Sequence, residues 1–217
     1  MKDILKRKRT IIWDFNGTLL NDTQLCIDCM NILLEERGLP FLDVSRYREI
    51  FTFPVRDYYV QLGFDFNKEP FEIPAHQFID LYRERLKSAP LQANAENLLH
   101  HFREQGFSQI ILSAMEQNFL EEVLMLKGIT GYFDIVAGIR DHLAEGKAEM
   151  AKEILQHHDP DKDDYILIGD TIHDYEVAAE LGIECILVAQ GHHSFERLSK
   201  LGCTVLEKLE QLKTNIK

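Results

Sequence analysis

Short apolar runs alternate with longer amphipathic segments along the C-terminal part of the chain. The short runs are rich in β-branched residues and show no polar–apolar alternation, which predicts strands buried on both faces, as in a parallel sheet. Several of the longer segments end just before a glycine, the residue that most readily ends a helix. The predicted strands lie at 109–113, 165–170 and 185–188, and the predicted helices at 96–105, 117–127, 147–157, 175–181 and 195–201.

A run at 10–14 has the same strand character, but the next seventy or so residues show only helical patterns. Helices are predicted at 22–37, 44–51, 56–62 and 75–87, with breaks at Pro54, Pro70 and Pro74. Strand–helix alternation at the spacing of the C-terminal part favours an α/β sheet with right-handed crossovers. We therefore expect a doubly wound parallel α/β core formed by residues 1–20 and 91–217, with a small all-helical cap at 21–90 inserted after the first strand.

Charge and hydropathy narrow the classes of partner. The chain has 24 Lys and Arg against 36 Asp and Glu, a net charge of −12, which repels nucleic acids and anionic membranes. A small phosphorylated substrate is still compatible, because local donors and a metal ion can override the net field. No apolar run approaches the roughly 18 residues of a membrane span, and the stretch after the basic N-terminus is too short for a secretory leader. We expect a cytoplasmic protein without nucleic-acid or membrane partners.

Two short motifs have competing interpretations. Cys26 and Cys29 form a C-x-x-C pair inside an apolar segment, which we interpret as two buried residues one helical turn apart rather than half of a zinc site or a redox pair. The segment around Lys147 resembles a mononucleotide-binding loop only in part, since position 141 is Asp and position 148 is Ala. With no G-x-G-x-x-G either, the sequence argues against a P-loop ATPase or a nicotinamide enzyme.

Three of the predicted strands end in a polar residue: Asp14, Ser113 and Asp170. In open parallel sheets the carboxyl ends of the strands face the ligand crevice, so these side chains should converge. Each one alone is common at a turn. All three together, with Lys147 opening a nearby helix, predict a reactive site.

These residues resemble the motifs of a known family. Residues 14–20, Asp-Phe-Asn-Gly-Thr-Leu-Leu, resemble the nucleophile motif D-x-D-G-T-[LV] of the haloacid dehalogenase-like hydrolases. Ser113 resembles the second motif, Lys147 the third, and the segment from Gly169 to Asp174 the fourth, G-D-x-x-x-D, all in the family's order. Within the family the pattern most resembles the phosphoglycolate phosphatase-like branch. The helical insertion predicted at 21–90 is similar to the small α-helical cap of that branch.

The resemblance implies a Mg²⁺-dependent phosphatase that hydrolyses a small phosphorylated metabolite, a phosphoglycolate-like phosphomonoester, through an aspartyl-phosphate. A carboxylate can attack phosphorus, and Mg²⁺ prefers oxygen ligands. The sequence leaves two interpretations of Arg56 in the insertion: a side chain that contacts the substrate, or an exposed helix residue. The implied residues are Asp14, Asn16 and Lys147 for catalysis; Gly17, Thr18, Ser113, Ala114 and Lys147 for the phosphoryl group; and Asp14, the backbone carbonyl of Asn16, Asp170 and Asp174 for the metal.

Asn16 departs from the family's pattern. The pattern has Asp at this position, which protonates the leaving oxygen and then activates water, whereas an amide cannot shuttle a proton. Since such assistance is typically worth about 10²–10⁴-fold, we expect slow hydrolysis of alkyl phosphates and a relative preference for leaving groups that need no proton. Two alternatives remain: a catalytically weakened phosphate-binding or regulatory protein, and an intramolecular phosphotransferase (a mutase).

Overall fold

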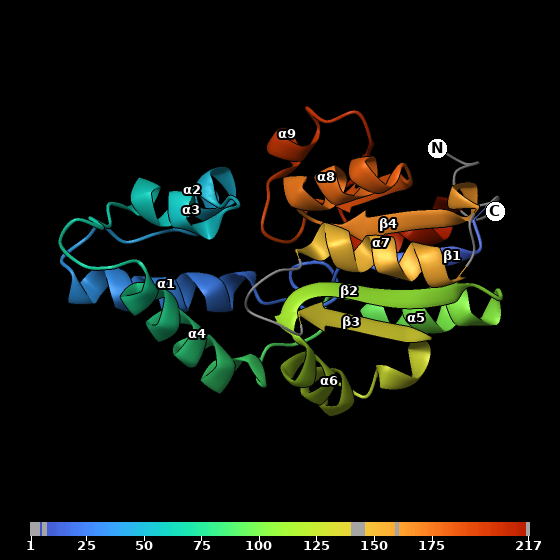
Figure 1. Ribbon diagram of the computed structural model, residues 1–217, viewed down its shortest axis with the longest axis horizontal. Helices are drawn as coiled ribbons and strands as arrows, with labels where there is room; N and C mark the ends of the chain where they lie inside the picture. Colours follow the sequence, from blue (N-terminus) through green and yellow to red (C-terminus); the bar gives the residue numbers. More distant parts are fainter. Residues whose placement is uncertain (1–4, 6–7, 140–145, 159–160, 216–217) are drawn as a thin grey trace.

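Six strands form one fully parallel sheet (Figure 1). The computed structural model describes residues 5, 8–139, 146–158 and 161–215. The strand order is β3-β2-β1-β4-β5-β6, so the order reverses between β1 and β4. This arrangement confirms the predicted doubly wound parallel sheet. The strands are β1 (Thr10–Trp13), β2 (Ser108–Glu116), β3 (Ile135–Ile139), β4 (Tyr165–Gly169), β5 (Glu184–Val188) and β6 (Thr204–Leu206).

Helices cover both faces of the sheet. Ile11 and Trp13 of β1 belong to one hydrophobic cluster, whereas Ile12 between them belongs to another. The sheet is therefore buried on both sides, which explains why its central strands lack polar–apolar alternation. The first cluster includes side chains of α5 (Ala95–Glu104), α6 (Gln117–Leu126) and the 3-10 helix η4 (Leu209–Asn215), and the second includes side chains of α7 (Lys147–His158), α8 (Ile172–Leu181) and α9 (Phe195–Leu198).

Sequence analysis missed the two edge strands. β3 is mostly half-buried and β6 has three residues, so neither shows the long apolar run of a central strand. The helix predicted at 195–201 ends earlier, at Leu198. Two further 3-10 turns, η2 (Thr130–Tyr132) and η3 (Lys162–Asp164), precede β3 and β4.

Four helices follow β1 and lie beside the sheet in Figure 1: α1 (Thr23–Glu36), α2 (Val44–Ile50), α3 (Val55–Leu62) and α4 (Glu72–Leu86). We call residues 21–90 the helical insertion. It has a hydrophobic cluster of its own, and both Cys26 and Cys29 are buried in α1. The break predicted at Pro74 is wrong, because Pro74 lies in the first turn of α4, where a missing N–H costs no helical hydrogen bond.

The two connections between the insertion and the core run side by side. The Asn21 amide donates to the Pro90 carbonyl at 2.9 Å, and the Gln92 amide donates to the Leu19 carbonyl at 2.8 Å. In α2, the Arg48 guanidinium donates to the carbonyls of Gln190 and Gly191. The insertion is therefore held to the core through α2 as well as through its two connections. Within the described residues, none of the helices has the length and apolar character needed to cross a membrane.

Candidate active site

Three buried carboxylates meet where the strand order reverses. Asp14 follows β1, Asp170 follows β4, and Asp174 lies in the first turn of α8. Ligand oxygens of the three lie within 4.8 Å of one another. Because the carboxyl ends of parallel strands open on the ligand crevice at such a reversal, this position suits a reactive site.

Lys147, the first residue of α7, bridges two of these carboxylates. Its Nζ lies 2.5 Å from Asp14 Oδ1 and 2.5 Å from Asp174 Oδ1. Burial acts to lower the pKa of Lys147, but Asp14 and Asp174 outweigh it and raise that pKa, so the amine is a fixed cation. Burial likewise acts to raise the pKa of Asp174, but Lys147 and the hydrogen bonds from Thr171 keep it below its usual range. The structure therefore holds a preformed Lys147–Asp174 ion pair beside Asp14.

Negative charge remains in excess around this pair. Burial raises the pKa of Asp14 well above its usual range, and Asp174 and Asp170 add to the rise against the opposing effect of Lys147. Burial and the nearby Asp174 raise the pKa of Asp170 to about 8, although the Thr18 hydroxyl and the His192 amide donate to its carboxylate. Three buried carboxylates with one lysine fit a hard divalent cation such as Mg²⁺, which takes oxygen ligands and would neutralise the excess.

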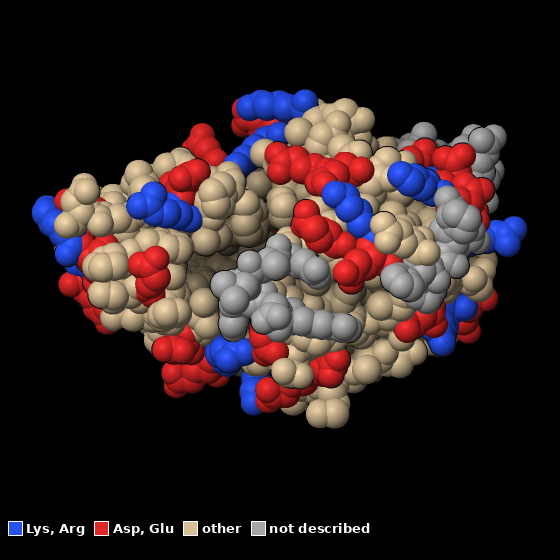
Figure 2. Space-filling model, in the orientation of Figure 1, with Lys and Arg blue, Asp and Glu red and all other residues tan. Residues whose placement is uncertain are grey.

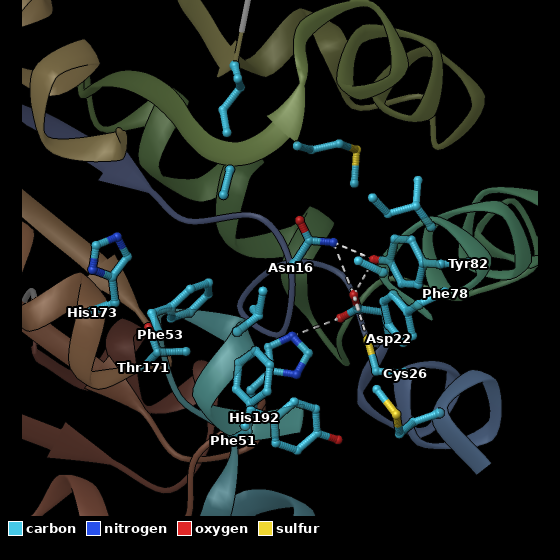
Figure 3. A pocket seen from close by; sticks show the side chains of 18 of the residues that line it. Asn16, Asp22, Cys26, Phe51, Phe53, Phe78, Tyr82, Thr171, His173 and His192 are labelled. Atoms are coloured by element: carbon cyan, nitrogen blue, oxygen red, sulfur yellow. Dashed lines mark hydrogen bonds and ion pairs between the residues drawn. The ribbon is translucent and has the colours of Figure 1, made fainter. Parts of the chain in front are cut away.

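Asn16 is held by three hydrogen bonds, and Figure 3 draws those to Tyr82 and Asp22. Its Nδ2 donates to the Tyr82 hydroxyl at 2.6 Å and to Asp22 Oδ2 at 3.0 Å, and its Oδ1 accepts from the Ser113 hydroxyl at 3.3 Å. An aspartate at this position would set its charge against the Asp22 carboxylate. An amide is therefore the residue that matches these surroundings.

Asp22 and Tyr82 are site residues that sequence analysis missed. Asp22 is the N-cap residue of α1, yet its side chain makes no capping hydrogen bond. It accepts instead from the Gly17 amide at 2.8 Å and from the Tyr82 hydroxyl, and His192 Nε2 lies 3.5 Å from its Oδ1. Tyr82 comes from α4, 66 residues beyond Asn16, and no pattern in the sequence indicates that the two meet.

Of the residues predicted to hold the phosphoryl group, two line the cavity and three are hydrogen-bonded to other residues of the site. Ala114 and Lys147 line the cavity described below. The Thr18 hydroxyl donates to Asp170 and the Gly17 amide to Asp22, so both residues support the carboxylates. Ser113 donates to Asn16 and accepts from the Met115 amide.

Gly17 is required by space as well as by conformation. Its φ is +78°, and a Cβ there would lie 2.6 Å from His192 Cδ2 and closer still to the Asp170 carboxylate. Gly106 has a similar φ of +82°, but a Cβ there would meet nothing within 4 Å. We expect Gly106→Ala to lower the free energy of unfolding by about 1 kcal/mol, from the left-handed backbone alone. Gly17→Ala should lower the free energy of unfolding by about 1–3 kcal/mol more than Gly106→Ala does, because its methyl group would overpack the site.

Denaturant unfolding of the two variants checks this expectation. Gly17→Ala should also displace Asp170 and His192. Equal unfolding free energies for the two variants would show that the space around Gly17 is not restrictive.

The structure does not bring Arg56 to the site. This side chain is exposed on α3, and its guanidinium stacks on the Phe66 ring with Cζ 5.0 Å from the ring centroid. Of the two interpretations left open by the sequence, the structure favours an exposed helix arginine.

A cavity of about 850 Å³ joins the carboxylates to the helical insertion. Asp14, Asn16 and Lys147 line its core side, and mainly aromatic side chains of the insertion line the other. Figure 2 shows a hollow on this face, bordered on the insertion side mainly by uncharged side chains. Asn16, Asp22 and Tyr82 lie together at the wall of the cavity in Figure 3.

Comparison with known proteins places this geometry in context. Residues 11–188 match the family model described as "Haloacid dehalogenase-like hydrolase". The chain is 24% identical to a 5'-nucleotidase of Pseudomonas aeruginosa, covering 91% of this chain and 90% of the relative, and 25% identical to "Probable phosphatase IndB" of Dickeya dadantii, covering 88% and 85%. A haloacid dehalogenase-like hydrolase structure from Streptococcus pneumoniae superposes with a TM-score of 0.81 at 22% identity, covering 96% of this chain and 98% of that one.

Proposed function

The chain belongs to the haloacid dehalogenase-like hydrolase family, and from this premise we propose that it is a Mg²⁺-dependent phosphatase. It hydrolyses a small phosphorylated metabolite through a phosphoenzyme on Asp14. The observation that carries the proposal is the position of Asp14 at the end of β1, with the Lys147 amine at 2.5 Å and the cavity before it. The names of the two curated relatives, a 5'-nucleotidase and a phosphatase, support the same class of reaction.

The chain's own residues supply the parts of a two-step hydrolysis. An Asp14 carboxylate oxygen attacks phosphorus and the bond from phosphorus to the leaving oxygen breaks. Lys147 holds positive charge beside the attacking carboxylate, where the negative charge of the phosphoryl oxygens spreads. Water then attacks the aspartyl-phosphate and restores the Asp14 carboxylate. Asn16 orients neighbours through its amide but exchanges no proton in either step.

Mg²⁺ would be held by the carboxylates of Asp14, Asp170 and Asp174 and by the backbone carbonyl of Asn16. When bound, the ion would neutralise phosphoryl oxygen charge and lower the repulsion between a phosphate dianion and the carboxylates. The support for this assignment is the donor set itself: hard oxygen ligands, buried, with more negative charge than Lys147 balances.

A panel of phosphate monoesters tests the proposed activity. Phosphate release is measured with Mg²⁺, and with the metal removed by a chelator, beside the Asp14→Asn variant. Turnover that requires both Mg²⁺ and Asp14 is the expected result. Phosphate binding without turnover on any ester would favour a regulatory protein, and interconversion of sugar phosphates without free phosphate would favour a mutase.

Mg²⁺ is expected to raise the thermal unfolding midpoint of the wild type, because a ligand that binds only the folded state stabilises it. At a concentration 100 times the dissociation constant the gain is about 2.7 kcal/mol. Asp170→Asn removes one proposed ligand and should abolish most of this Mg²⁺-dependent shift. Asp161 lies outside the cluster, as the N-cap of the 3-10 turn before β4, and provides a control, since Asp161→Asn should leave the shift intact. Equal shifts in both variants would place the metal elsewhere.

The hypothesis that Asn16 leaves the enzyme without a general acid–base needs a variant that adds no second negative charge beside Asp22. Asn16→Asp alone would oppose the Asp22 charge, whereas the double variant Asn16→Asp/Asp22→Asn keeps an amide–carboxylate pair in place. We expect the double variant to raise kcat on an alkyl phosphate by on the order of 10²-fold, and by less on an aryl phosphate. Equal gains on both esters would contradict the assignment of Asn16 to the missing acid–base role.

A further inference from the structure

Building on the proposed phosphatase activity, we propose that the substrate is an aryl phosphate. In such an ester the leaving oxygen is attached to an uncharged aromatic ring, here one that carries a hydrogen-bonding group. The proposal rests on three features of the cavity: its aromatic wall, the pairing of the described lysine and arginine side chains that line it, and a tyrosine hydroxyl without a partner among the described residues. The amide at Asn16 supports it independently.

The cavity is far larger than a phosphate group requires. About 850 Å³ is within the range of pockets that enclose drug-sized ligands, so most of the space is available to the leaving group. A two-carbon acid such as glycolate would leave the insertion side unfilled. The volume of the cavity therefore favours a substrate whose leaving group contains at least one ring.

The wall opposite the carboxylates is aromatic. Phe51 contacts Tyr47, Phe53 and Tyr58 at ring-centroid distances of 5.1, 5.4 and 5.3 Å. Phe53 lies 5.0 Å from the His173 ring, lines the cavity and is 42% exposed. Figure 3 shows Phe51 and Phe53 on one side and Phe78 and Tyr82 on the other, with Asn16 between them. Offset and edge-to-face contacts with such rings favour a flat aromatic ligand.

Within the described part of the chain, the cavity offers no unpaired lysine or arginine to a charged leaving group. Among the described residues that line it, the lysine and arginine side chains are Lys147 and Arg83. Lys147 is shared by Asp14 and Asp174, and Arg83 donates to Glu116 and stacks on the Phe119 ring. A carboxylate or a second phosphate on the organic part would therefore be desolvated without a partner from these residues, which is unfavourable. An uncharged ring meets no such penalty.

One hydroxyl in the described wall lacks a hydrogen-bond partner. Tyr58 is 3% exposed and lines the cavity, yet its hydroxyl makes no hydrogen bond with the described residues. Buried polar groups are nearly always paired, so an unpaired one beside a cavity points to a ligand group that completes it. We assign this role to a polar substituent on the ring of the substrate.

The amide at Asn16 favours the same class of substrate as the aromatic wall, because an aryl leaving group needs no proton from this residue. Asp14 attacks phosphorus, the phosphorus–oxygen bond to the ring breaks, and the electron pair stays on the ring oxygen as a phenolate. A phenol has a pKa of about 10, as in tyrosine, so its anion departs without a proton from Asn16 and takes one from water afterwards. Water then cleaves the aspartyl-phosphate, and the net reaction consumes one water and yields a phenol and inorganic phosphate.

Relative kcat/KM values for matched esters test the proposal. Phenyl phosphate has an aromatic leaving oxygen, benzyl phosphate has the ring on an alkyl oxygen, and cyclohexyl phosphate has neither feature. We expect phenyl phosphate to exceed cyclohexyl phosphate by at least about 10²-fold, with benzyl phosphate between them. Higher values for phosphoglycolate or adenosine 5'-monophosphate than for phenyl phosphate, or equal values for phenyl and cyclohexyl phosphate, would overturn it.

Two variants connect the preference to the wall. Phe53→Leu should lower the ratio of kcat/KM for phenyl phosphate over methyl phosphate by about tenfold, mainly through KM. Tyr58→Phe should lower kcat/KM for 4-hydroxyphenyl phosphate relative to phenyl phosphate without loss of thermal stability, since the hydroxyl it removes is unpaired among the described residues. Unchanged ratios in both variants would contradict the assignment of the ring to this wall.

The same panel of esters distinguishes a failure of the proposed phosphatase activity from a failure of the aryl phosphate assignment. If no ester releases phosphate with Mg²⁺, the proposed function fails and the substrate class fails with it. If phosphoglycolate or other alkyl esters are hydrolysed and aryl esters are not, the phosphatase stands and only the aryl assignment falls.

Discussion

Replacing Asp14 with asparagine is expected to lower kcat for phosphate release by about 10⁴-fold or more, because the variant has no carboxylate to form the phosphoenzyme. The fold should be retained. The amide has the same shape, and Lys147 keeps its contact with Asp174. Since burial and the neighbouring acids raise the pKa of Asp14, loss of its charge should relieve repulsion in the metal-free protein. We therefore expect an inactive variant whose unfolding free energy is within about 1 kcal/mol of the wild type or above it.

Trapping of the intermediate gives this prediction a second measurement. Because Asn16 cannot activate water, hydrolysis of the aspartyl-phosphate should be slow, and acid-quenched wild type should carry one extra phosphoryl group by mass spectrometry. A rapid burst of the leaving group should precede steady turnover. Phosphoryl transfer to any residue in Asp14→Asn, or more than about 1% residual turnover, would remove Asp14 from the proposed role.

Replacing Lys147 with methionine is expected to damage activity and stability together. It removes the cation beside Asp14, and loss of one such electrostatic contact typically costs about 10²–10³-fold in kcat. It also leaves Asp14 and Asp174 buried without their partner, which costs about 3–5 kcal/mol for a broken buried pair. Chemical denaturation and phosphate release are the two measurements.

The stability loss should depend on pH with a defined sign. In the wild type, Lys147 holds the pKa of Asp174 below its usual range, so this pair stabilises the fold above the unfolded pKa of an aspartate. Without Lys147 that pKa should rise, so the Asp174 carboxyl would be neutral at moderately acidic pH. The difference in unfolding free energy between wild type and Lys147→Met should therefore be largest near pH 8 and shrink toward pH 4.

Lys152 provides a matched control in the same helix. It pairs with Glu180 on the surface, where both side chains are about half exposed. Lys152→Met should therefore change the unfolding free energy by less than about 1 kcal/mol and leave kcat unaltered. A Lys152→Met variant as damaging as Lys147→Met would show that the helix, and not the buried ion pair, is sensitive to the substitution.

The carboxylate cluster could be predicted from sequence because its parts are local. Asp14 and Asp170 each follow a short apolar run, and parallel strands bring such positions to one edge of a sheet whatever their separation along the chain. Burial on both faces gave the central strands their continuous apolar runs. The edge strands β3 and β6 lack such runs, because an edge position needs fewer apolar residues to be stable.

The surroundings of Asn16 could not be predicted in this way. In the sequence, Asp22 is only the first residue of a predicted helix, and Tyr82 is one aromatic residue among many in the insertion. The fold places both against the Asn16 amide. Likewise, nothing local distinguished Arg56, which stacks on Phe66, from Arg48, which donates to the core.

The sequence alone therefore determined the parallel sheet and which strand ends carry acids, since both follow from local hydrophobic patterns and chain geometry. Tertiary structure decided which side chains of the helical insertion face those acids, and so the aromatic character of the cavity. The physical reason is that the orientation of a helix across a cavity depends on how separate helices pack, and no periodicity within a single helix specifies its partner.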